Sequence, residues 1–192
     1  MATGFAIRAD LRSVELALAT VKNGVPSAAT RAINRTLTTV RAEAARDVAA
    51  DIGVPVRQVA AAMVITKARF TDLRGVITIT GRRIRLIDLN ATGPEPSRGA
   101  GSGVSYALGG GRRRIGSAFI ATMRSGHRGV FKRKGRTRLP IQELFGPSIP
   151  RVAAKTSILS ALKTLGQQTL TRNLGSEIRY LLSGTRVPTG DE

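Results

Sequence analysis

The chain has 192 residues, of which 42% are hydrophobic, which is enough for one domain with a sizeable core. It carries 31 Lys and Arg against 12 Asp and Glu, giving a net charge of +19, and it has no cysteine. These values exclude disulfides and thiolate metal sites, and they call for a polyanion or an acidic protein as a neighbour. We expect no membrane span, because no apolar run approaches about 18 residues, and no signal peptide, because the N-terminus lacks a basic stretch followed by an apolar core.

Residues 26–52 predict a long amphipathic helix. Gly53 suits its C-terminal cap, and Pro55 can open a short helix directly after it. One face is marked by apolar positions at spacings of three and four: Ile33, Leu37, Val40, Ala44, Val48 and Ile52. The other face carries Arg31, Arg35, Arg41 and Arg46. This basic face is interpreted as solvated, with contact to a partner as the alternative.

From Met63 to Leu89 the pattern changes to alternating β-branched residues, which is typical of strands. Two such strands, at 76–80 and 84–89, flank Gly81-Arg82. Glycine at the first of these two positions suits a type II′ turn, so the sequence predicts a hairpin over 76–89.

Residues 93–111 contain seven of the 21 glycines. Such a composition predicts a mobile loop with one short strand at 104–108, and we expect the loop to become ordered on assembly. The three glycines at 109–111 precede three arginines but lack the Lys-Ser/Thr ending of a P-loop. A nucleotide site is therefore not indicated.

Residues 128–141 predict a second hairpin, with Lys134-Gly135 at its tip. The stretch from Arg82 to Arg138 holds 14 basic residues against two acidic ones. Few aromatic residues are interleaved, which disfavours single-strand recognition by stacking and leaves duplex DNA or an acidic protein surface. The candidate contacts to such a partner are Arg112, Arg113, Arg114, Arg128, Lys132, Arg133, Lys134, Arg136 and Arg138.

Residues 139–150 form an apolar segment whose path is fixed by three prolines. It is either a connector pinned to the core or a contact between subunits, and both interpretations remain open. The candidate subunit contacts are Leu139, Pro140, Ile141, Leu144, Phe145, Pro147, Ile149 and Pro150.

A second long helix is predicted from about Pro150 to Ser183, followed by a frayed tail at 185–192. Its apolar stripe comprises Leu159, Leu162, Leu170, Leu174, Ile178 and Leu181. Gly166 and Gly175 weaken an isolated helix, so we expect close packing or a bend there. The whole chain, 1–192, is predicted to be a single α+β domain. Two long amphipathic helices pack on a small antiparallel sheet, with basic hairpin and Gly-rich loop extensions.

Catalytic groups are sparse. His127 is the only histidine, and no cysteine can complete a nucleophilic triad. Asp72, Asp88, Glu95 and Glu143 are too scattered to hold two metal ions. We therefore predict no catalytic residues, no metal site and no cofactor.

The block from Ala118 to Pro150 resembles the phage minor tail protein Z family. An Ala-Phe-Ile segment, a Ser-Gly, a Val-Phe-x-Arg hairpin, a Leu-Pro-Ile and a Gly-Pro-Ser-Ile-Pro tail follow in the family's order. The run Arg-Ala-Ile-Asn-Arg-Thr at 31–36, with the helix after it, is similar to the family's N-terminal half.

The resemblance implies a non-enzymatic tail completion protein at the head-proximal end of a long non-contractile tail, where it joins the head. It implies a ring, expected to be a hexamer, beside the tail terminator and the tail tube or head-completion proteins, with packaged double-stranded DNA as a further partner and no membrane. The expected location is the virion, and the host cytoplasm during assembly. The alternatives are a basic nucleic-acid-binding protein without sequence specificity, and a metal-dependent nuclease.

Overall fold

The computed structural model describes residues 3–8, 24–95, 103–135 and 137–184. Its internal contacts divide the chain into two compact units. The first, here named the helical unit, comprises residues 2–44, 63–79 and 155–192. The second, the hairpin unit, comprises residues 45–62 and 80–154, together with residue 1. Residues 96–102 of the predicted mobile loop and the predicted frayed tail at 185–192 lie outside the described residues.

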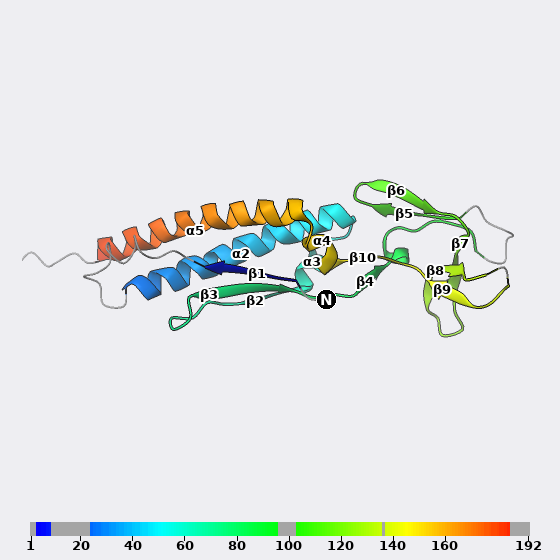
Figure 1. Cartoon of the computed structure of the whole chain (residues 1–192), viewed down its shortest axis with the longest axis horizontal. Coiled ribbons are helices and arrows are strands. Elements are labelled where there is room, and N and C mark those ends of the chain that lie inside the picture. Colours follow the sequence, from blue (N-terminus) through cyan, green and yellow to red (C-terminus); the bar gives the residue numbers. More distant parts are fainter. Residues whose placement is uncertain (1–2, 9–23, 96–102, 136, 185–192) are drawn as a thin grey trace, which may run out of the picture. The chain divides into compact units, whose positions relative to one another are not determined.

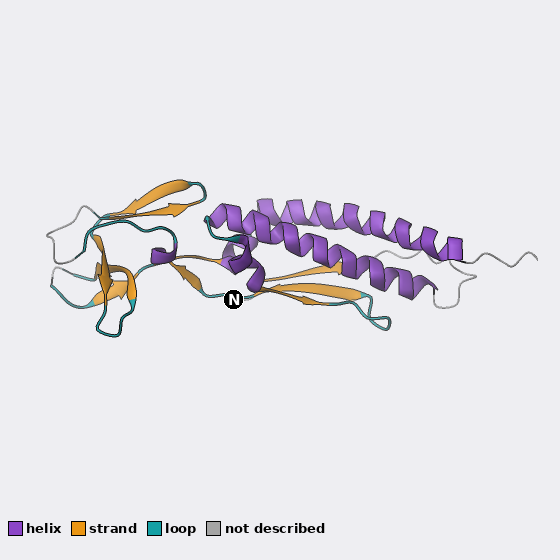
Figure 2. Cartoon of the chain, turned by 180° about the vertical axis from the view of Figure 1, so that it is seen from behind, coloured by secondary structure: helices purple, strands orange, loops and turns teal. Residues whose placement is uncertain are grey.

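The helical unit consists of a three-stranded antiparallel sheet and two long helices (Figures 1 and 2). The strand order is β1 (Thr3–Arg8), β3 (Arg74–Ile79), β2 (Met63–Thr66), so β3 is central. The helices are α2 (Gly24–Ile52), whose last residues continue into the hairpin unit, and α5 (Thr156–Gly184). Within this unit α2 lies between the sheet and α5, as both views show. The predicted α+β class, with long helices packed on a small antiparallel sheet, is confirmed.

The buried face of α2 is wide and rich in alanine, which lets its neighbours approach closely. Ala28, Ala29 and Ala32 are fully buried beside Ile33 and Leu37. Gly75 of β3 lies directly against this face: a Cβ at Gly75 would be 3.0 Å from Cγ2 of Ile33 and closer still to Leu37. The packing of sheet on helix therefore depends on a missing side chain at this position.

The basic face of α2 is exposed at Arg31, Arg35 and Arg46, as predicted, but at least three of its arginines also contact other elements of the chain. Arg31 and Arg35 each place a guanidinium nitrogen 2.8 Å from a carboxylate oxygen of Glu177, which α5 holds in a buried position. Arg41 donates from Nε to the backbone oxygen of Met63, at 3.2 Å. Periodicity alone could not reveal this, because the buried acid is distant in sequence.

The predicted helix over 150–183 is interrupted. A short helix, α4 (Ile149–Ala153), ends before α5 begins at Thr156. The stripe on α5 is partly as predicted, since Leu162, Leu170 and Leu174 are buried, but Thr169 and Glu177 are buried with them. Close packing does not explain Gly175, because a Cβ there would meet nothing within 4 Å.

The C-terminal end of α2 is as predicted. Gly53 has a positive φ of 85°, and its N–H donates to the Ala49 oxygen at 2.8 Å. Val54 donates to the same oxygen at 3.2 Å, which completes the cap. Pro55 then precedes the short helix α3 (Val56–Ala61).

The hairpin unit contains three small antiparallel sheets. The first pairs β4 (Arg83–Arg85) with β10 (Phe145–Ser148). The second pairs β5 (Val104–Leu108) with β6 (Gly111–Ile115), and the third has the order β7 (Ala118–Thr122), β8 (Arg128–Arg133), β9 (Ile141–Glu143). A single 3₁₀ turn, η1 (Leu86–Asp88), follows β4.

The predicted hairpin over 76–89 is wrong. β3 pairs with β1 and β2, so that Ile77 lies opposite Phe5 and Ile65. β4 pairs instead with β10, which follows it by about sixty residues in the chain. Gly81 does not have the positive φ that a type II′ turn requires.

Two other strand predictions are confirmed. The hairpin at 128–141 forms between β8 and β9, with Arg133 opposite Ile141, and the strand at 104–108 is β5. β5 also pairs with β6 across Gly109 and Gly110, whose φ values of 60° and 77° are those of a type I′ turn. This hairpin and the pairing of β7 with β8 were not predicted.

Candidate partner-binding surface of the hairpin unit

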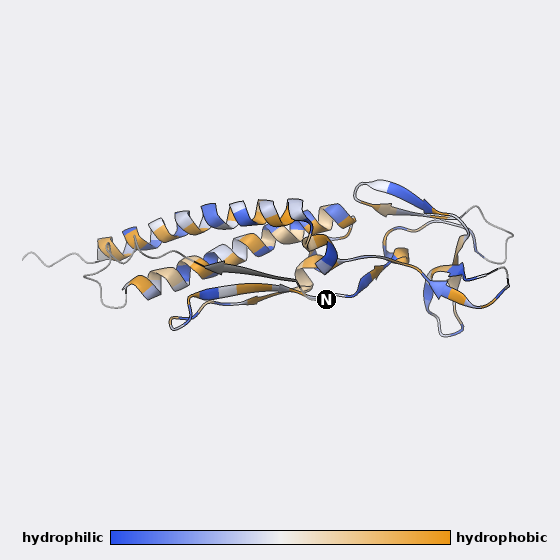
Figure 3. Cartoon of the chain, in the orientation of Figure 1, coloured by the Kyte–Doolittle hydropathy of each residue, from blue (hydrophilic) through white to orange (hydrophobic). Residues whose placement is uncertain are grey.

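The predicted cationic contacts all belong to the hairpin unit, and those that the structure describes are exposed. Three lie on β6, whose hydrophilic character is clear in Figure 3. The others lie on β8 and in the connection from β8 to β9: Arg128, Lys132, Arg133, Lys134 and Arg138. Arg136 lies outside the described residues. The structure thus gathers the predicted residues on two hairpins.

Arg112 is held by its own chain. Its Nε donates to the Ser105 hydroxyl at 3.1 Å, and its Nη2 donates to the Thr92 hydroxyl at 2.7 Å. The same nitrogen also reaches the backbone oxygens of Asn90, at 3.3 Å, and of Ser105, at 3.2 Å. Arg114 likewise interacts within the chain. Arg112 therefore fastens the β5–β6 hairpin to residues 90–92, and its guanidinium has few donors left for a partner.

On β8, two cations have partners in the chain. The Arg133 guanidinium carbon lies 5.8 Å from the centroid of the Phe119 ring, a cation–π contact. Arg128 lies 3.7 Å from the Glu95 carboxylate, and both side chains are more than half exposed. Such an exposed pair contributes little to stability, so Arg128 remains available to a partner.

Among the predicted cationic contacts, four make no hydrogen bond, ion pair or ring contact from their side chains to any described residue: Arg113, Lys132, Lys134 and Arg138. Arg113 lies on β6, Lys132 lies on β8, and Lys134 and Arg138 lie in the connection from β8 to β9, and all four are exposed to solvent. Positive charges left unpaired in this way are suited to contact with a polyanion or an acidic protein.

His127 has a structural partner that the sequence did not predict. Its Nε2 lies 2.9 Å from Oε1 of Glu143, and its ring meets Phe131 edge-on, with centroids 6.3 Å apart. The turn between β7 and β8 is thereby tied to β9. Across the part of the chain that the structure describes, no three His, Asp or Glu side chains are grouped as metal ligands would be.

The apolar segment 139–150 is exposed at one end and buried at the other. Leu139 and Phe145 are 67% and 44% exposed, and Pro140 is exposed as well. Ile141, Leu144 and Pro147 are half-buried, whereas Ile149 and Pro150 are buried. The buried end behaves as a connector anchored in the unit, and the exposed end offers apolar surface to another molecule.

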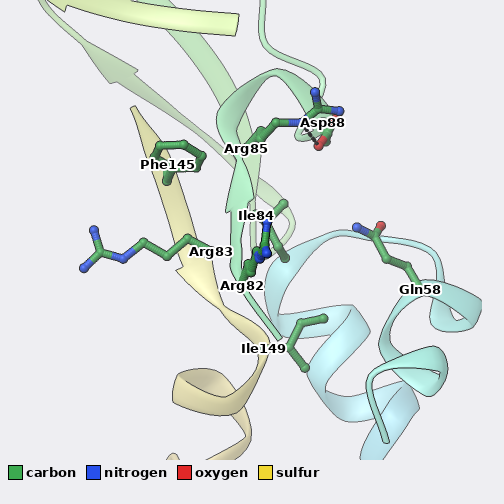
Figure 4. A pocket seen from close by; sticks show the side chains of 8 residues that line it. All are labelled: Gln58, Arg82, Arg83, Ile84, Arg85, Asp88, Phe145 and Ile149. Atoms are coloured by element: carbon green, nitrogen blue, oxygen red, sulfur yellow. Dashed lines mark hydrogen bonds and ion pairs between the residues drawn. The ribbon is translucent and has the colours of Figure 1, made fainter. Parts of the chain in front are cut away.

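An open pocket of about 690 Å³ lies at α3, β4 and β10 (Figure 4). Its lining residues are Gln58, Arg82, Arg83, Ile84, Arg85, Asp88, Phe145 and Ile149. This site was not predicted from the sequence, although the adjacent Arg82 and Arg83 were a visible signal. The pairing of β4 with β10, which brings Phe145 and Ile149 to the arginines, could not be read from the local pattern.

Within the pocket Arg85 is neutralised by Asp88. Its Nε and Nη2 each donate to a different Asp88 oxygen at 2.9 Å. The hydrogen bond to Asp88 and the negative charge of that residue raise the pKa of Arg85, so Arg85 stays a cation at neutral pH. Arg82 and Arg83, by contrast, have no side-chain partner among the described residues.

None of the described helices has a stretch long and apolar enough to cross a membrane. Comparison with curated proteins and with solved structures gives no match. Comparison with protein families matches residues 13–185 to the model of prophage minor tail protein Z (GPZ). The match includes both long helices, the basic hairpins and the apolar segment 139–150. Since nearly the whole chain is matched, the chain belongs to the prophage minor tail protein Z family, and it is a structural protein of a phage tail.

Proposed function

We propose that the protein completes the phage tail at its head-proximal end and is needed for joining head to tail. Several copies form a ring, which we expect to be a hexamer, beside the tail terminator and the tail tube or head-completion proteins. The protein acts by binding and geometry rather than by catalysis. Family membership supports a structural role in the tail, and the surface of the hairpin unit supports the more specific role.

The observation that carries this proposal is the set of unpaired cations on the two hairpins. Arg113, Lys132, Lys134 and Arg138 are exposed and have no side-chain partner among the described residues. A chain of net charge +19 gains most from a neighbour of opposite sign. We expect such a neighbour at the head-proximal end of the tail to be either the DNA that passes through it or an acidic surface of an adjacent protein.

The exposed part of the apolar segment supports contact between subunits. Leu139 is the most exposed of the large hydrophobic side chains described, and Pro140 beside it is exposed as well. With half-buried Ile141, these residues form a short apolar surface that a second copy can cover in a ring.

Joining can be tested with the triple variant Lys132→Gln, Lys134→Gln and Arg138→Gln, expressed from the induced prophage. We expect joined particles to fall about tenfold or more, which corresponds to about 1.4 kcal/mol of lost binding. Free heads and free tails should accumulate and can be counted by electron microscopy. The matched control replaces three exposed cations of α5, Lys163, Arg172 and Arg179, by Gln. Equal particle yields from both variants would contradict the proposal.

The alternative is a nucleic-acid-binding protein that acts without a ring. It predicts that the isolated monomer binds duplex DNA, with a logarithmic salt slope near −0.9 for each phosphate contact. If the triple variant flattened that slope while joined particles stayed at the parental level, this alternative would replace the joining role.

A further inference from the structure

The pocket at α3, β4 and β10 combines an apolar floor with arginines at its rim. Ile84 and Ile149 are each 5% exposed, whereas Phe145 keeps 44% of its surface open. Figure 4 shows these side chains on neighbouring elements, with Phe145 on β10 and Gln58 on the opposite side, on α3. A volume of about 690 Å³ lies within the usual range of ligand pockets, about 300–1,000 Å³. It suits a few residues of a peptide.

The uncompensated charge in the pocket is positive and comes from two adjacent residues. Asp88 is already engaged by Arg85 through two hydrogen bonds, and Glu143, the other acid that acts on Arg85, is bonded to His127. Arg82 and Arg83 have no such partner among the described residues. Each guanidinium can bind a carboxylate with two parallel hydrogen bonds.

The backbone beside these side chains is also incompletely paired. β4 pairs on one side with β10, and in the described part of the chain no strand pairs with its other side. An extended peptide can add to such an edge by main-chain hydrogen bonds while its side chains occupy the pocket. An extended segment is therefore the shape that uses both features.

We propose that this pocket binds an extended segment of another virion protein, one that carries two carboxylates and one bulky apolar side chain. The carboxylates pair with Arg82 and Arg83, and the apolar side chain packs on Phe145 and Ile149. Duplex DNA is less suited, because its phosphates would leave Phe145 unused and would have to approach Asp88. The inference rests on the proposed function in one respect, that the partner is a neighbour in the virion.

Binding can be measured with the full-length protein and a fluorescein-labelled, capped peptide of alternating Asp and Leu residues. We expect Arg82→Gln with Arg83→Gln to weaken binding at least about tenfold, since two charge-assisted contacts are lost. Phe145→Ala should weaken it about fivefold, because the apolar contact is lost. A peptide with Asn in place of Asp should bind poorly to the parent.

The matched control is Arg172→Gln with Arg179→Gln, which removes the same charge from the exposed face of α5. Equal weakening by this control would overturn the proposal, because it would show general cationic attraction. A 20-base-pair duplex whose binding falls with the Arg82 and Arg83 changes, but not with Phe145→Ala, would assign the site to nucleic acid instead. Circular dichroism verifies that each variant is folded.

The partner can be identified by replacing Phe145 with photoreactive benzoylphenylalanine in assembling particles. We expect crosslinks to an acidic segment of a different virion protein, identified by mass spectrometry. Crosslinks to a second copy of this chain would overturn the proposal. The two proposals can fail separately. The peptide experiment measures binding to the pocket alone, and the particle yield of the Lys132, Lys134 and Arg138 variant measures joining alone.

Discussion

At the scale of single residues, the least expected finding is the buried carboxylate of Glu177. Its side chain is 4% exposed, while the two arginines that contact it, Arg31 and Arg35, are 43% and 62% exposed. The arginines can therefore be hydrated if the acid is removed, whereas the acid cannot be hydrated if the arginines are removed. Replacing the two arginines and replacing the acid should therefore change the free energy of unfolding by different amounts.

We expect Arg31→Gln with Arg35→Gln to lower the free energy of unfolding by about 3 kcal/mol, because a buried charge loses both partners. Glu177→Gln should cost less, about 1 kcal/mol, since an amide can still accept a hydrogen bond. Combining all three changes should recover part of the loss. Urea unfolding of the four proteins measures the cycle, and equal costs for the two sides would refute the asymmetry.

Two glycines of the helical unit should respond to the same substitution with opposite signs. Gly75→Ala places a methyl group against Leu37 and Ile33, so we expect a loss of about 1–3 kcal/mol from overpacking. Gly175→Ala lies within α5 and meets nothing within 4 Å, so we expect a gain of about 0.5–1 kcal/mol from helix propensity. Thermal unfolding separates the two, and destabilisation by Gly175→Ala would contradict the open space found at this position.

At the scale of elements, the existence of strands and helices was easier to predict than their partners. Alternation located strands near 76–80 and 84–89, but it could not show that β3 pairs with β1 and β2 while β4 pairs with β10. Those pairings join segments far apart in the sequence, and local pattern carries no information on them. The hairpin of β8 and β9 was predictable because its partners are adjacent and its turn contains Gly135.

The roles of the cations also depend on partners that are distant in the sequence, so local pattern could not assign them. Composition and clustering placed Arg112 and Arg113 in one candidate surface, and both are exposed on β6. The structure separates them, because the side chain of Arg112 makes hydrogen bonds to Asn90, Thr92 and Ser105, whereas the side chain of Arg113 makes none to the described residues. The pocket at Arg82 and Arg83 was missed for the related reason that Phe145 and Ile149, which complete its lining, lie about sixty residues later in the sequence.

Arg112→Gln should therefore loosen the β5–β6 hairpin, whereas Arg113→Gln should not. Each hydrogen bond that Arg112 donates contributes about 0.5–1.5 kcal/mol net to the stability of the hairpin. Because these bonds are exposed, we expect the Arg112 variant to lose only about 1 kcal/mol in total. Hydrogen exchange of the backbone amides at 104–115 measures the opening of this hairpin directly, and we expect about fivefold faster exchange in the Arg112 variant. Equal exchange in the two variants would mean that Arg112 is as free as its neighbour.

At the scale of the whole molecule, the family match and the composition point the same way. The match over residues 13–185 defines a structural protein of a phage tail, and the net charge of +19 describes a subunit suited to acidic surroundings. Sequence motifs at 118–150 were sufficient to find the family, because they combine strand, turn and proline positions in a fixed order. Division into two compact units was not evident from sequence, since each unit is assembled from separate stretches of chain.

The same charge should make the isolated protein respond unusually to salt. Repulsion among 31 basic residues is only partly offset by 12 acidic ones, and screening shortens its range from about 30 Å at 0.01 M salt to about 8 Å at 0.15 M. We expect the midpoint of thermal unfolding to rise by about 3 °C over this interval, which corresponds to about 1 kcal/mol for a chain of this size. The variant Lys132→Gln, Lys134→Gln and Arg138→Gln removes three positive charges and should show a smaller rise. A midpoint that fell with salt would mean that ion pairs such as Arg31 with Glu177 stabilise the free subunit more than charge repulsion destabilises it. In that case an acidic partner would not be required to offset the repulsion.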